Sequence, residues 1–507
     1  MRKLLAGLAL CLFAMLSPMP ETGAVFHGDA FDRIDDYLRE HLERSSIPGA
    51  GYAIVDHGRI VHMNAFGVAG PNGRPMTPQT PLYLGSVGKT FTALAIRQLI
   101  NAGKLELNLP VVRYLPDFTL ADDGAARLIT IRQLLDHTSG LGNQDGNDPA
   151  FYDPEATNAD LVRLMAAYRT NRPVGTAFEY SNLNYIVLGR VVEVVTGMAY
   201  ADYVEQNIFA PLDMHHSFAD EANAVEDGLS AGYRYYFGLP VPVDLDEPAG
   251  AIAAGFLMSS AEDMAHYLIS FSGHGTYDGV TVVNPGGRSR PEDPQLVYNI
   301  DWLTQAEAKR ISNTETHSGG WLNYSAGIAF MPAEQIGVVV LANANPSQWM
   351  PVKDAFALTY DVLRLYTGNP PGPSTLPLRS LYVVADVILA LVALFVFYRI
   401  NSLRTWRRDL SEKGLAAGAW LPSLCFDLVL PLFILLVLPG LILASSGRIN
   451  PVWCWNRLAF QVPDATWAMF IPALALLFTG AVKIRVFLQS SGLRRTDRGL
   501  QIVSVKP

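Results

Sequence analysis

The chain has 507 residues, half of them hydrophobic, and a mean hydropathy of +0.18, so it is too long for one small domain and too apolar for an ordinary soluble enzyme. Its formal net charge of -9 and pI near 5.6 provide no broad cationic surface. This balance argues against nucleic acid as a partner and favours small neutral or mixed-charge substrates. The central region has no cysteine, which excludes a disulfide framework or a cysteine metal site there.

The first predicted element is an export signal over residues 1–24. Two basic residues precede an apolar run from Leu4 to Leu16, and prolines and small residues follow up to Ala24. Cleavage near Ala24 would leave the next domain outside the cytoplasm. The alternative is an uncleaved N-terminal anchor, which would place that domain on the same side.

A folded domain is predicted over residues 25–366. Apolar residues recur every three to four positions from Phe31 to Leu42, which predicts a helix, and two alternating strands follow across a turn at 56–58. Two further strands, Ala326–Met331 and Ile336–Ala342, end the domain. Strands at both ends with helices between them predict an α+β domain. The intervening helices are expected at 86–101, 131–136, 184–196 and 261–271.

Residues 367–380 are rich in proline and glycine and predict a linker, after which a membrane region is expected at 381–485. Three apolar stretches there are long enough to cross a bilayer: about 381–398, 420–444 and 467–484. Basic residues concentrate in the loop after the first span and in the tail at 486–507, so both are expected in the cytoplasm. We therefore expect a multi-pass protein of the inner (cytoplasmic) membrane, with the domain at 25–366 on the periplasmic or extracellular side.

One carboxylate, Asp427, lies within the second predicted span, where an unpaired charge is costly. The sequence leaves two alternatives open for it. Asp427 either faces a polar cavity between the helices, or it is paired or protonated without a further role.

The segment Ser86-Val87-Gly88-Lys89 places a hydroxyl and an amine three residues apart, on one face at the start of a predicted helix. A lysine can accept the proton of a serine when burial or positive neighbours lower its pKa. The helix N-terminus beneath Ser86 also favours the negative charge that develops on attack. A spacing of this kind is expected about once by chance in such a long chain, so the interpretation depends on its context.

Two further motifs provide that context: Tyr180-Ser181-Asn182, which precedes a predicted helix, and His317-Ser318-Gly319-Gly320, which precedes the last strand pair. Each has a purely structural interpretation, as a core aromatic, a helix cap or a turn. Their order and separations after Ser86 favour a shared catalytic site.

The order SxxK, YxN and (K/H)(S/T)G resembles the class C β-lactamase and penicillin-binding protein superfamily, with its relatives the family VIII esterases and D-amino-acid peptidases. The segments Leu134–Leu141, Phe178–Asn182 and Gly337–Asn343 are also similar to that family, and the resemblance covers about residues 28–366. It implies a β-lactamase/transpeptidase-like domain, with an antiparallel sheet and a helical subdomain. A hydrolase of this type followed by three membrane helices is similar in architecture to the colibactin-type prodrug-activating peptidases, which remove an N-acyl-D-asparagine cap.

By position, the resemblance implies that Ser86 is acylated, that Lys89 is the base, and that Tyr180 relays a proton to the leaving amine and helps to activate the deacylating water. The backbone amides of Ser86 and Gly320 would form the oxyanion hole. Asn182 would hold the substrate amide.

Two candidate binding residues depart from the pattern of the family. His317, expected to line the cleft, stands where true β-lactamases and transpeptidases usually have a lysine, and a histidine is only partly charged near neutrality. β-Lactam hydrolysis is therefore not expected as the main activity. Tyr83 stands where the colibactin-type enzyme has an acidic residue that meets its substrate. His137 is expected to have a structural role.

The sequence thus predicts an exported, membrane-anchored serine peptidase or amidohydrolase. Its expected substrate is a small peptide or an acyl-amide, such as an acyl-D-amino acid, and no metal or cofactor is implied. An esterase, a DD-carboxypeptidase or β-lactamase-like enzyme, and a sensor that a ligand acylates stay open as alternatives. The native substrate and the oligomeric state do not follow from the sequence.

Overall fold

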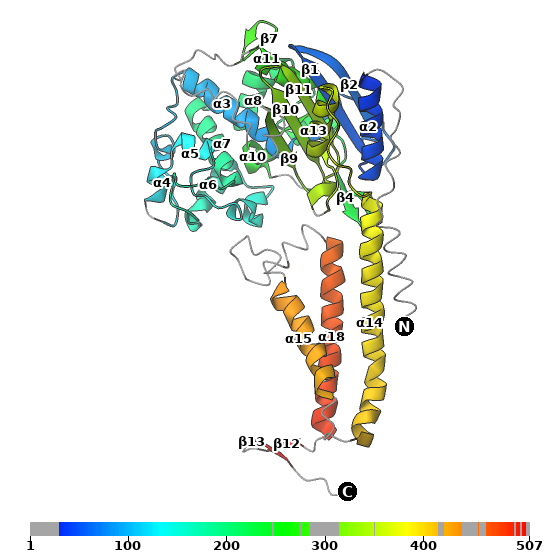
Figure 1. Ribbon diagram of the computed structural model, residues 1–507. Coiled ribbons are helices and arrows are strands. Elements are labelled where there is room, and N and C mark those ends of the chain that lie inside the picture. The colour runs from blue at the N-terminus through cyan, green and yellow to red at the C-terminus, as the bar shows by residue number, and fades with distance from the viewer. Residues whose placement is uncertain are drawn as a thin grey trace. The chain divides into compact units, whose positions relative to one another are not determined.

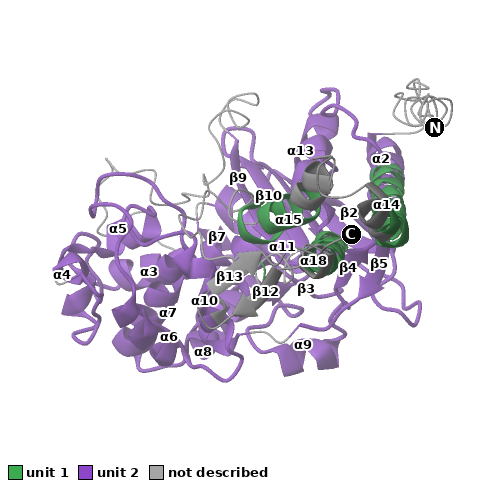
Figure 2. Cartoon of the chain, turned by 90° about the horizontal axis from the view of Figure 1, so that it is seen from below, with its two compact units in different colours: residues 1–12, 380–507 green, residues 13–379 purple. Residues whose placement is uncertain are grey.

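The computed structural model describes residues 30–282 except 123, 246–247 and 274; 314–413 except 349; 420–438; 455; and 463–502 except 491–492 and 497–498. The chain divides into two compact units, one that ends at Arg379 and one that begins at Ser380 (Figure 2). The predicted export signal at 1–24 lies outside the described residues.

A five-stranded antiparallel sheet forms the centre of the first unit, in the order β2-β1-β11-β10-β9 (Figure 1). The strands are β1 (Gly49–Asp56), β2 (Arg59–Gly67), β9 (Glu315–Gly320), β10 (Ser325–Met331) and β11 (Ile336–Ala342). The predicted N-terminal hairpin and the predicted final strand pair are both confirmed, and they belong to the same sheet because β1 pairs with β11.

Both faces of the sheet are buried, because successive side chains of a strand point to opposite faces. In β1, Ile54 belongs to one hydrophobic core and Val55 to the other. The helices α2 (Ala30–Arg44) and α13 (Ala355–Tyr366) cover the first face, and α11 (Ala261–Ser272) packs against the second. The predicted α+β class is therefore confirmed.

A helical subdomain extends the second core. Its main helices are α3 (Lys89–Asn101), α4 (Ala125–Leu128), α5 (Ile131–Leu135), α6 (Asn158–Leu164), α7 (Asn182–Thr196), α8 (Tyr200–Val204), α9 (Glu221–Asp227) and α10 (Ile252–Gly255). Helix α7 begins two residues earlier than predicted because the side chain of Ser181 accepts a hydrogen bond from the backbone N–H of Leu183 and caps it. The short strands pair as β3 (Leu82–Tyr83) with β6 (Met258–Ser259), β4 (Tyr233–Tyr236) with β5 (Leu239–Pro242), and β7 (Thr276–Tyr277) with β8 (Val280–Thr281).

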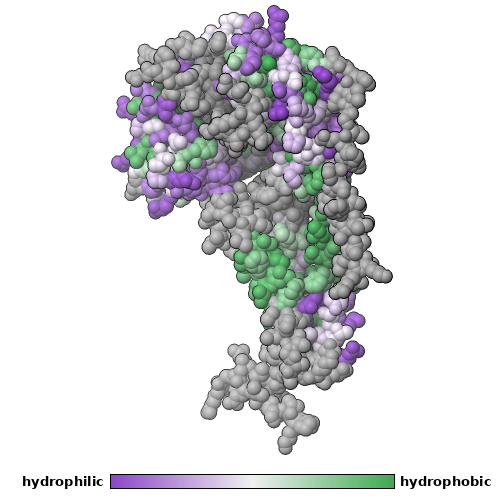
Figure 3. Space-filling model, viewed as in Figure 1, coloured by the Kyte–Doolittle hydropathy of each residue, from purple (hydrophilic) through white to green (hydrophobic). Residues whose placement is uncertain are grey.

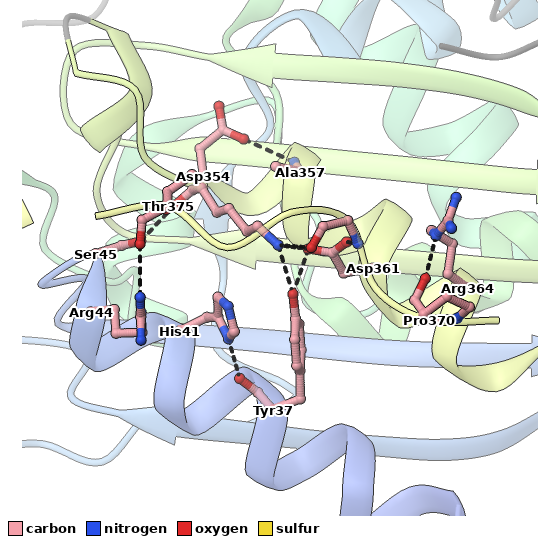
Figure 4. A network of polar contacts seen from close by, with 12 residues as sticks. Tyr37, His41, Arg44, Ser45, Asp354, Ala357, Asp361, Arg364, Pro370 and Thr375 are labelled. Carbon is pink, nitrogen blue, oxygen red and sulfur yellow. Dashed lines mark hydrogen bonds and ion pairs between the residues drawn. The ribbon is translucent and has the colours of Figure 1, made fainter. Parts of the chain in front are cut away.

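A buried polar cluster joins α2, α13 and the segment that follows α13. Tyr37 donates a hydrogen bond to Asp361 (2.7 Å), as the close-up in Figure 4 shows. Lys353 forms an ion pair with the same carboxylate at 2.7 Å, and Asp361 also accepts from the backbone N–H of Gly372 (2.6 Å). Residues 369–377, within the predicted linker, contain no helix or strand, and this cluster holds them against the first unit.

The described residues of the second unit form α14 (Leu378–Lys413), α15 (Trp420–Leu436) and α18 (Pro463–Ser490), followed by β12 (Leu493–Thr496) and β13 (Gly499–Ile502). On the part of this unit that is coloured in Figure 3, hydrophobic residues gather in one large region. Within the described residues, two helical stretches are long and apolar enough to span a membrane, Leu378–Trp406 and Thr466–Val486. Within these residues the structure thus gives two candidate spans where the sequence predicted three. The middle helix is described only over a shorter length, and 439–444 of its predicted span lie outside the described residues.

Asp427 of α15 is fully buried between two cations. Arg399 of α14 donates to one carboxylate oxygen (2.6 Å) and Lys483 of α18 donates to the other (2.5 Å). Of the two alternatives that the sequence left open, the structure supports pairing. One carboxylate thus connects α14, α15 and α18.

Candidate active site

Ser86 lies on a 3-10 turn, Gly85–Gly88. The sequence placed it in the first turn of an α-helix, but α3 begins only at Lys89. The turn forms because Gly85 has a φ of +54°, a conformation that side chains with a Cβ rarely adopt. A Cβ on Gly85 would also lie 2.5 Å from the backbone nitrogen of Gly320. Glycine is therefore required at 85, and it brings Ser86 against the end of strand β9.

Lys89, the first residue of α3, is 1% exposed and extends toward Ser86. Its Nζ donates to Ser86 Oγ (3.2 Å), to Asn182 Oδ1 (2.8 Å) and to the backbone oxygen of Ala254. All three acceptors are neutral oxygens. Burial without a counter-ion lowers the pKa of Lys89 from 10.5 to about 7, so near neutrality a large fraction of the amine is free to accept a proton.

Tyr180 is the second partner of the serine, with 2.6 Å between its hydroxyl oxygen and Ser86 Oγ. Its ring lies beneath the Lys89 ammonium, 5.0 Å from Nζ to the ring centroid. Burial raises the pKa of Tyr180 above its ordinary value, so the resting site holds the phenol and not the phenolate. Lys89 is therefore the better base of the two, and Tyr180 can pass protons between Ser86 and a leaving group.

His137 positions Tyr180. Its ring stacks on the Tyr180 ring with centroids 4.6 Å apart, and its Nδ1 accepts from the backbone N–H of Ser181 (3.0 Å). The side-chain amide of Asn184 lies 2.7 Å from the same nitrogen. Burial keeps the pKa of His137 well below 6.5, which suits an acceptor Nδ1. These contacts support the structural role predicted for His137.

The structure brings two of the four predicted binding residues directly to this centre. Asn182 accepts from Lys89 and donates through Nδ2 to the hydroxyl of Tyr152 (3.2 Å). Gly320 packs against the turn that carries Ser86, and a Cβ on its neighbour Gly319 would lie 1.9 Å from the backbone oxygen of Leu84. This close packing of β9 on the turn requires glycine at position 319.

The other two predicted binding residues are buried. His317 is 1% exposed, its Nδ1 lies 2.7 Å from the backbone oxygen of Ser318, and burial lowers its pKa to about 3. It is therefore neutral at physiological pH, where the sequence predicted partial charge. Tyr83 is 3% exposed and its ring packs 5.1 Å from that of Tyr324. A role for either side chain in substrate binding stays a prediction.

The sequence interpretation missed two contacts of the site. The backbone oxygen of Ala254 accepts from Lys89, and a backbone acceptor has no side-chain signature. The run of small residues Ala253-Ala254-Gly255 was a usable signal, since a Cβ on Gly255 would lie only 3.3 Å from the backbone of Gly85. Tyr152, which touches Asn182, lies outside every motif. In the described part of the chain, no group of three or more His, Cys, Asp or Glu residues could hold a metal ion.

Comparison with known proteins agrees with this geometry. The beta-lactamase family model matches residues 34–360. Protein flp of Staphylococcus aureus (strain COL) is 26% identical over 472 residues, which cover 91% of this chain and 92% of flp. The match to flp therefore extends well past the residues that the family model covers.

Two solved structures share the fold of the first unit. The octameric penicillin-binding protein homologue from Pyrococcus abyssi has a TM-score of 0.58 and 24% identity, covering 71% of this chain and 81% of its own. A class C beta-lactamase has a TM-score of 0.53 and 20% identity, covering 66% of this chain and 98% of its own. These likenesses confirm the β-lactamase/transpeptidase-like fold that the motifs implied.

Proposed function

This chain belongs to the beta-lactamase family, whose fold carries serine hydrolases, and from that premise we propose that it hydrolyses amide or peptide bonds through an acyl-enzyme on Ser86. The observation that carries the proposal is the contact between Ser86 Oγ and a buried lysine whose pKa lies near 7. A serine hydroxyl becomes a useful nucleophile only when a base is in place to receive its proton.

Acylation then follows from the contacts of the site. Neutral Lys89 takes the proton of Ser86 while Oγ attacks the substrate carbonyl, which becomes a tetrahedral oxyanion. The backbone amides of Ser86 and Gly320 are the proposed donors to that oxyanion. Tyr180 gives its proton to the leaving amine and regains one from the lysine ammonium, so the C–N bond breaks and the acyl ester remains. In the second half of the reaction, Lys89 takes a proton from water while the water oxygen attacks the ester. The proton then passes to Ser86 Oγ, and the carboxylic acid is released.

The class of substrate follows from the charge of the third motif. A β-lactamase or carboxypeptidase substrate carries a carboxylate, and a permanent cation is the usual partner for it. His317 is buried and its pKa is about 3, so it supplies no such charge. This favours an acyl-amide or peptide in which no carboxylate has to meet residue 317. A short-chain ester is the rival substrate, since the same acyl-enzyme would form from it.

We further propose that the second unit anchors the enzyme in a membrane. Support comes from the two apolar helices, Leu378–Trp406 and Thr466–Val486, and from the basic residues that follow the first of them. In this proposal the hydrolase unit lies on the periplasmic or extracellular side. Protease added to intact spheroplasts should cleave that unit, and protection until the membrane is lysed would refute the orientation.

The enzymatic proposal is tested by intact-mass labelling of the full chain with a fluorophosphonate, beside Ser86→Ala. One adduct on the wild type and none on Ser86→Ala is the expected result, and equal labelling of both would refute it. Turnover of matched acyl-D-amino-acid amides, short-chain esters and D-Ala-D-Ala peptides then decides the class. A strong preference for esters would reject the amidase proposal, and acylation without turnover would indicate a sensor.

A further inference from the structure

Three aromatic rings from separate segments meet one another, and each is linked to a residue of the proposed catalytic centre. Tyr152 stacks on Trp321 with centroids 5.2 Å apart and planes 28° apart. Phe256 meets Trp321 edge-on at 5.1 Å and 81°, and meets Tyr152 at 6.2 Å and 78°. These three residues are called the aromatic wall below. Such stacked and edge-on arrangements are those that aromatic rings prefer, so the wall has a defined shape.

Each ring of the wall is attached to a part of the catalytic centre. Trp321 directly follows Gly320 at the end of β9. Phe256 lies two residues after Ala254, whose carbonyl accepts from Lys89. The hydroxyl of Tyr152 accepts from Asn182 (3.2 Å). The wall thus lies on the side of Ser86 where the third motif and Asn182 converge.

The polar end of Tyr152 is turned away from its neighbours in the wall. Its hydroxyl donates to the backbone oxygen of Gly146 (3.0 Å) and accepts from Asn182. Both hydrogen bonds therefore go to residues outside the wall. The ring face that remains packs on Trp321. Phe256 is buried, whereas Tyr152 and Trp321 keep partial exposure. The accessible part of the wall is therefore mainly hydrocarbon.

The charges near the wall point to the same kind of ligand. His317 belongs to the same strand as Gly320 and is neutral at physiological pH. Lys89 is fully buried, and its recorded hydrogen bonds go to Ser86, Asn182 and Ala254. A ligand group that reaches this side of the site therefore meets aromatic surface and amide groups. Apolar groups gain free energy when such a surface removes them from water.

We infer that the aromatic wall selects the acyl group of the substrate, and that this group is large and apolar: an aliphatic chain of several carbons or an aromatic ring. The inference rests on the proposed acyl-enzyme function of Ser86 and adds its specificity. Trp321 is the main specificity residue, because it is partly exposed and directly follows Gly320, whose amide is a proposed donor to the oxyanion.

The test is a series of p-nitrophenyl esters from acetyl to octanoyl, plus phenylacetyl, assayed with the full-length protein in detergent. Each methylene that leaves water should raise kcat/KM about two- to fourfold, so hexanoyl, with four more methylenes than acetyl, should exceed it by roughly 16- to 250-fold. Trp321→Ala should reduce this hexanoyl-to-acetyl ratio to about threefold or less, and Trp321→Phe should keep most of it. Phe237→Ala, which changes an exposed aromatic in the β4–β5 hairpin, should leave the ratio at the wild-type value.

The ratio separates selection from mere folding, because a loss of folded enzyme lowers both rates equally. Fluorophosphonate labelling of each variant gives the fraction of competent sites. A wild type that prefers acetyl, or a Trp321→Ala variant with the wild-type ratio, would overturn the inference while Ser86 labelling still supported the proposed function. Absence of labelling and of turnover with every ester would instead refute the proposed function itself.

Discussion

Two buried lysines of the first unit show how the same side chain serves chemistry in one place and stability in another. Lys89 is surrounded by neutral acceptors, and burial alone lowers its pKa to about 7. Lys353 is equally hidden from water but lies 2.7 Å from the carboxylate of Asp361 (Figure 4 shows this carboxylate and its Tyr37 partner). A counter-ion favours the charged lysine, whereas its absence favours the neutral amine. Lys89 can thus act as a base because its hydrogen-bond partners are neutral and include no carboxylate.

The second unit repeats the paired arrangement. Lys483 is buried and shares the carboxylate of Asp427 with Arg399. Each of the two paired lysines also joins separate segments: Lys353 joins α2 with α13, and Lys483 joins α18 with α15. Lys89 therefore differs from the other two lysines in its partners and not in its burial. Substitutions can test this difference.

The largest expected effect is on catalysis. Lys89→Met keeps the volume and the apolar stem of the side chain but removes the base, so kcat/KM should fall by roughly 10²- to 10⁴-fold. Steady-state hydrolysis of the best substrate from the ester and amide panel measures this. A loss of less than tenfold would show that another group deprotonates Ser86.

The next effect is on stability. Lys353→Met leaves Asp361 buried without its cation, and removal of one partner of a buried ion pair costs about 3 to 5 kcal/mol. Urea unfolding of the first unit, followed by intrinsic fluorescence, should show that loss in the free energy of unfolding. The activity per folded molecule should stay near that of the wild type.

Lys89→Met is the matched control, and its stability should change in the opposite direction. A lysine with a folded pKa of about 7 and an unfolded pKa near 10.5 destabilises the fold at neutral pH, so Met should add about 1 to 4 kcal/mol at pH 7. The gain should shrink as pH rises from 7 to 10, because the unfolded lysine then loses its proton too. If Lys89→Met and Lys353→Met lowered the free energy of unfolding by equal amounts, the proposed difference between the two lysines would be contradicted.

A smaller effect is expected in the second unit. Asp427→Asn removes the carboxylate that Arg399 and Lys483 share, and should lower the stability of the helices by about 1 to 3 kcal/mol. Thermal loss of helical circular dichroism in detergent measures it. Asp386→Asn, which removes another carboxylate of α14, serves as the control and should unfold at the same temperature as the wild type.

The smallest effect is the pH dependence of the wild type. Because the active form has neutral Lys89, kcat/KM should rise about tenfold per pH unit below pH 7 and level off above it. A pH series from 5 to 9 with an uncharged substrate gives the profile. A rate that is constant from pH 5.5 to 8 would remove Lys89 from the role of base.

The sequence predicted the residues of the site better than their surroundings. Ser86 Oγ lies at hydrogen-bond distance from both Lys89 and Tyr180. The contact with Lys89 follows from their local spacing, whereas Tyr180 was recognised through the resemblance of its motif to the family pattern. The strands β1, β2, β10 and β11 were also readable, because short apolar runs that end at turn residues are a local signal, whereas β9, which carries the third motif, was not predicted as a strand. The fold class and the bounds of β11 needed no tertiary information.

What failed depends on contacts between distant segments. The turn at Gly85 replaces a first helical turn because β9 packs against it, and no pattern near residue 85 reports that approach. The neutrality of His317 comes from its burial, which the motif does not encode. The partners of Asp427 lie on two other helices, and the aromatic wall joins three segments.

The pairing of β1 with β11 also limits how early the first unit can finish folding during synthesis. Ala50 pairs with Ala342, so the middle of the sheet closes only after almost the whole first unit has left the ribosome. Pairings between such distant positions require a long loop to close and make folding slow. For a unit that we propose to be exported, the delay is useful, because a chain that has not yet folded can be threaded through a translocation channel.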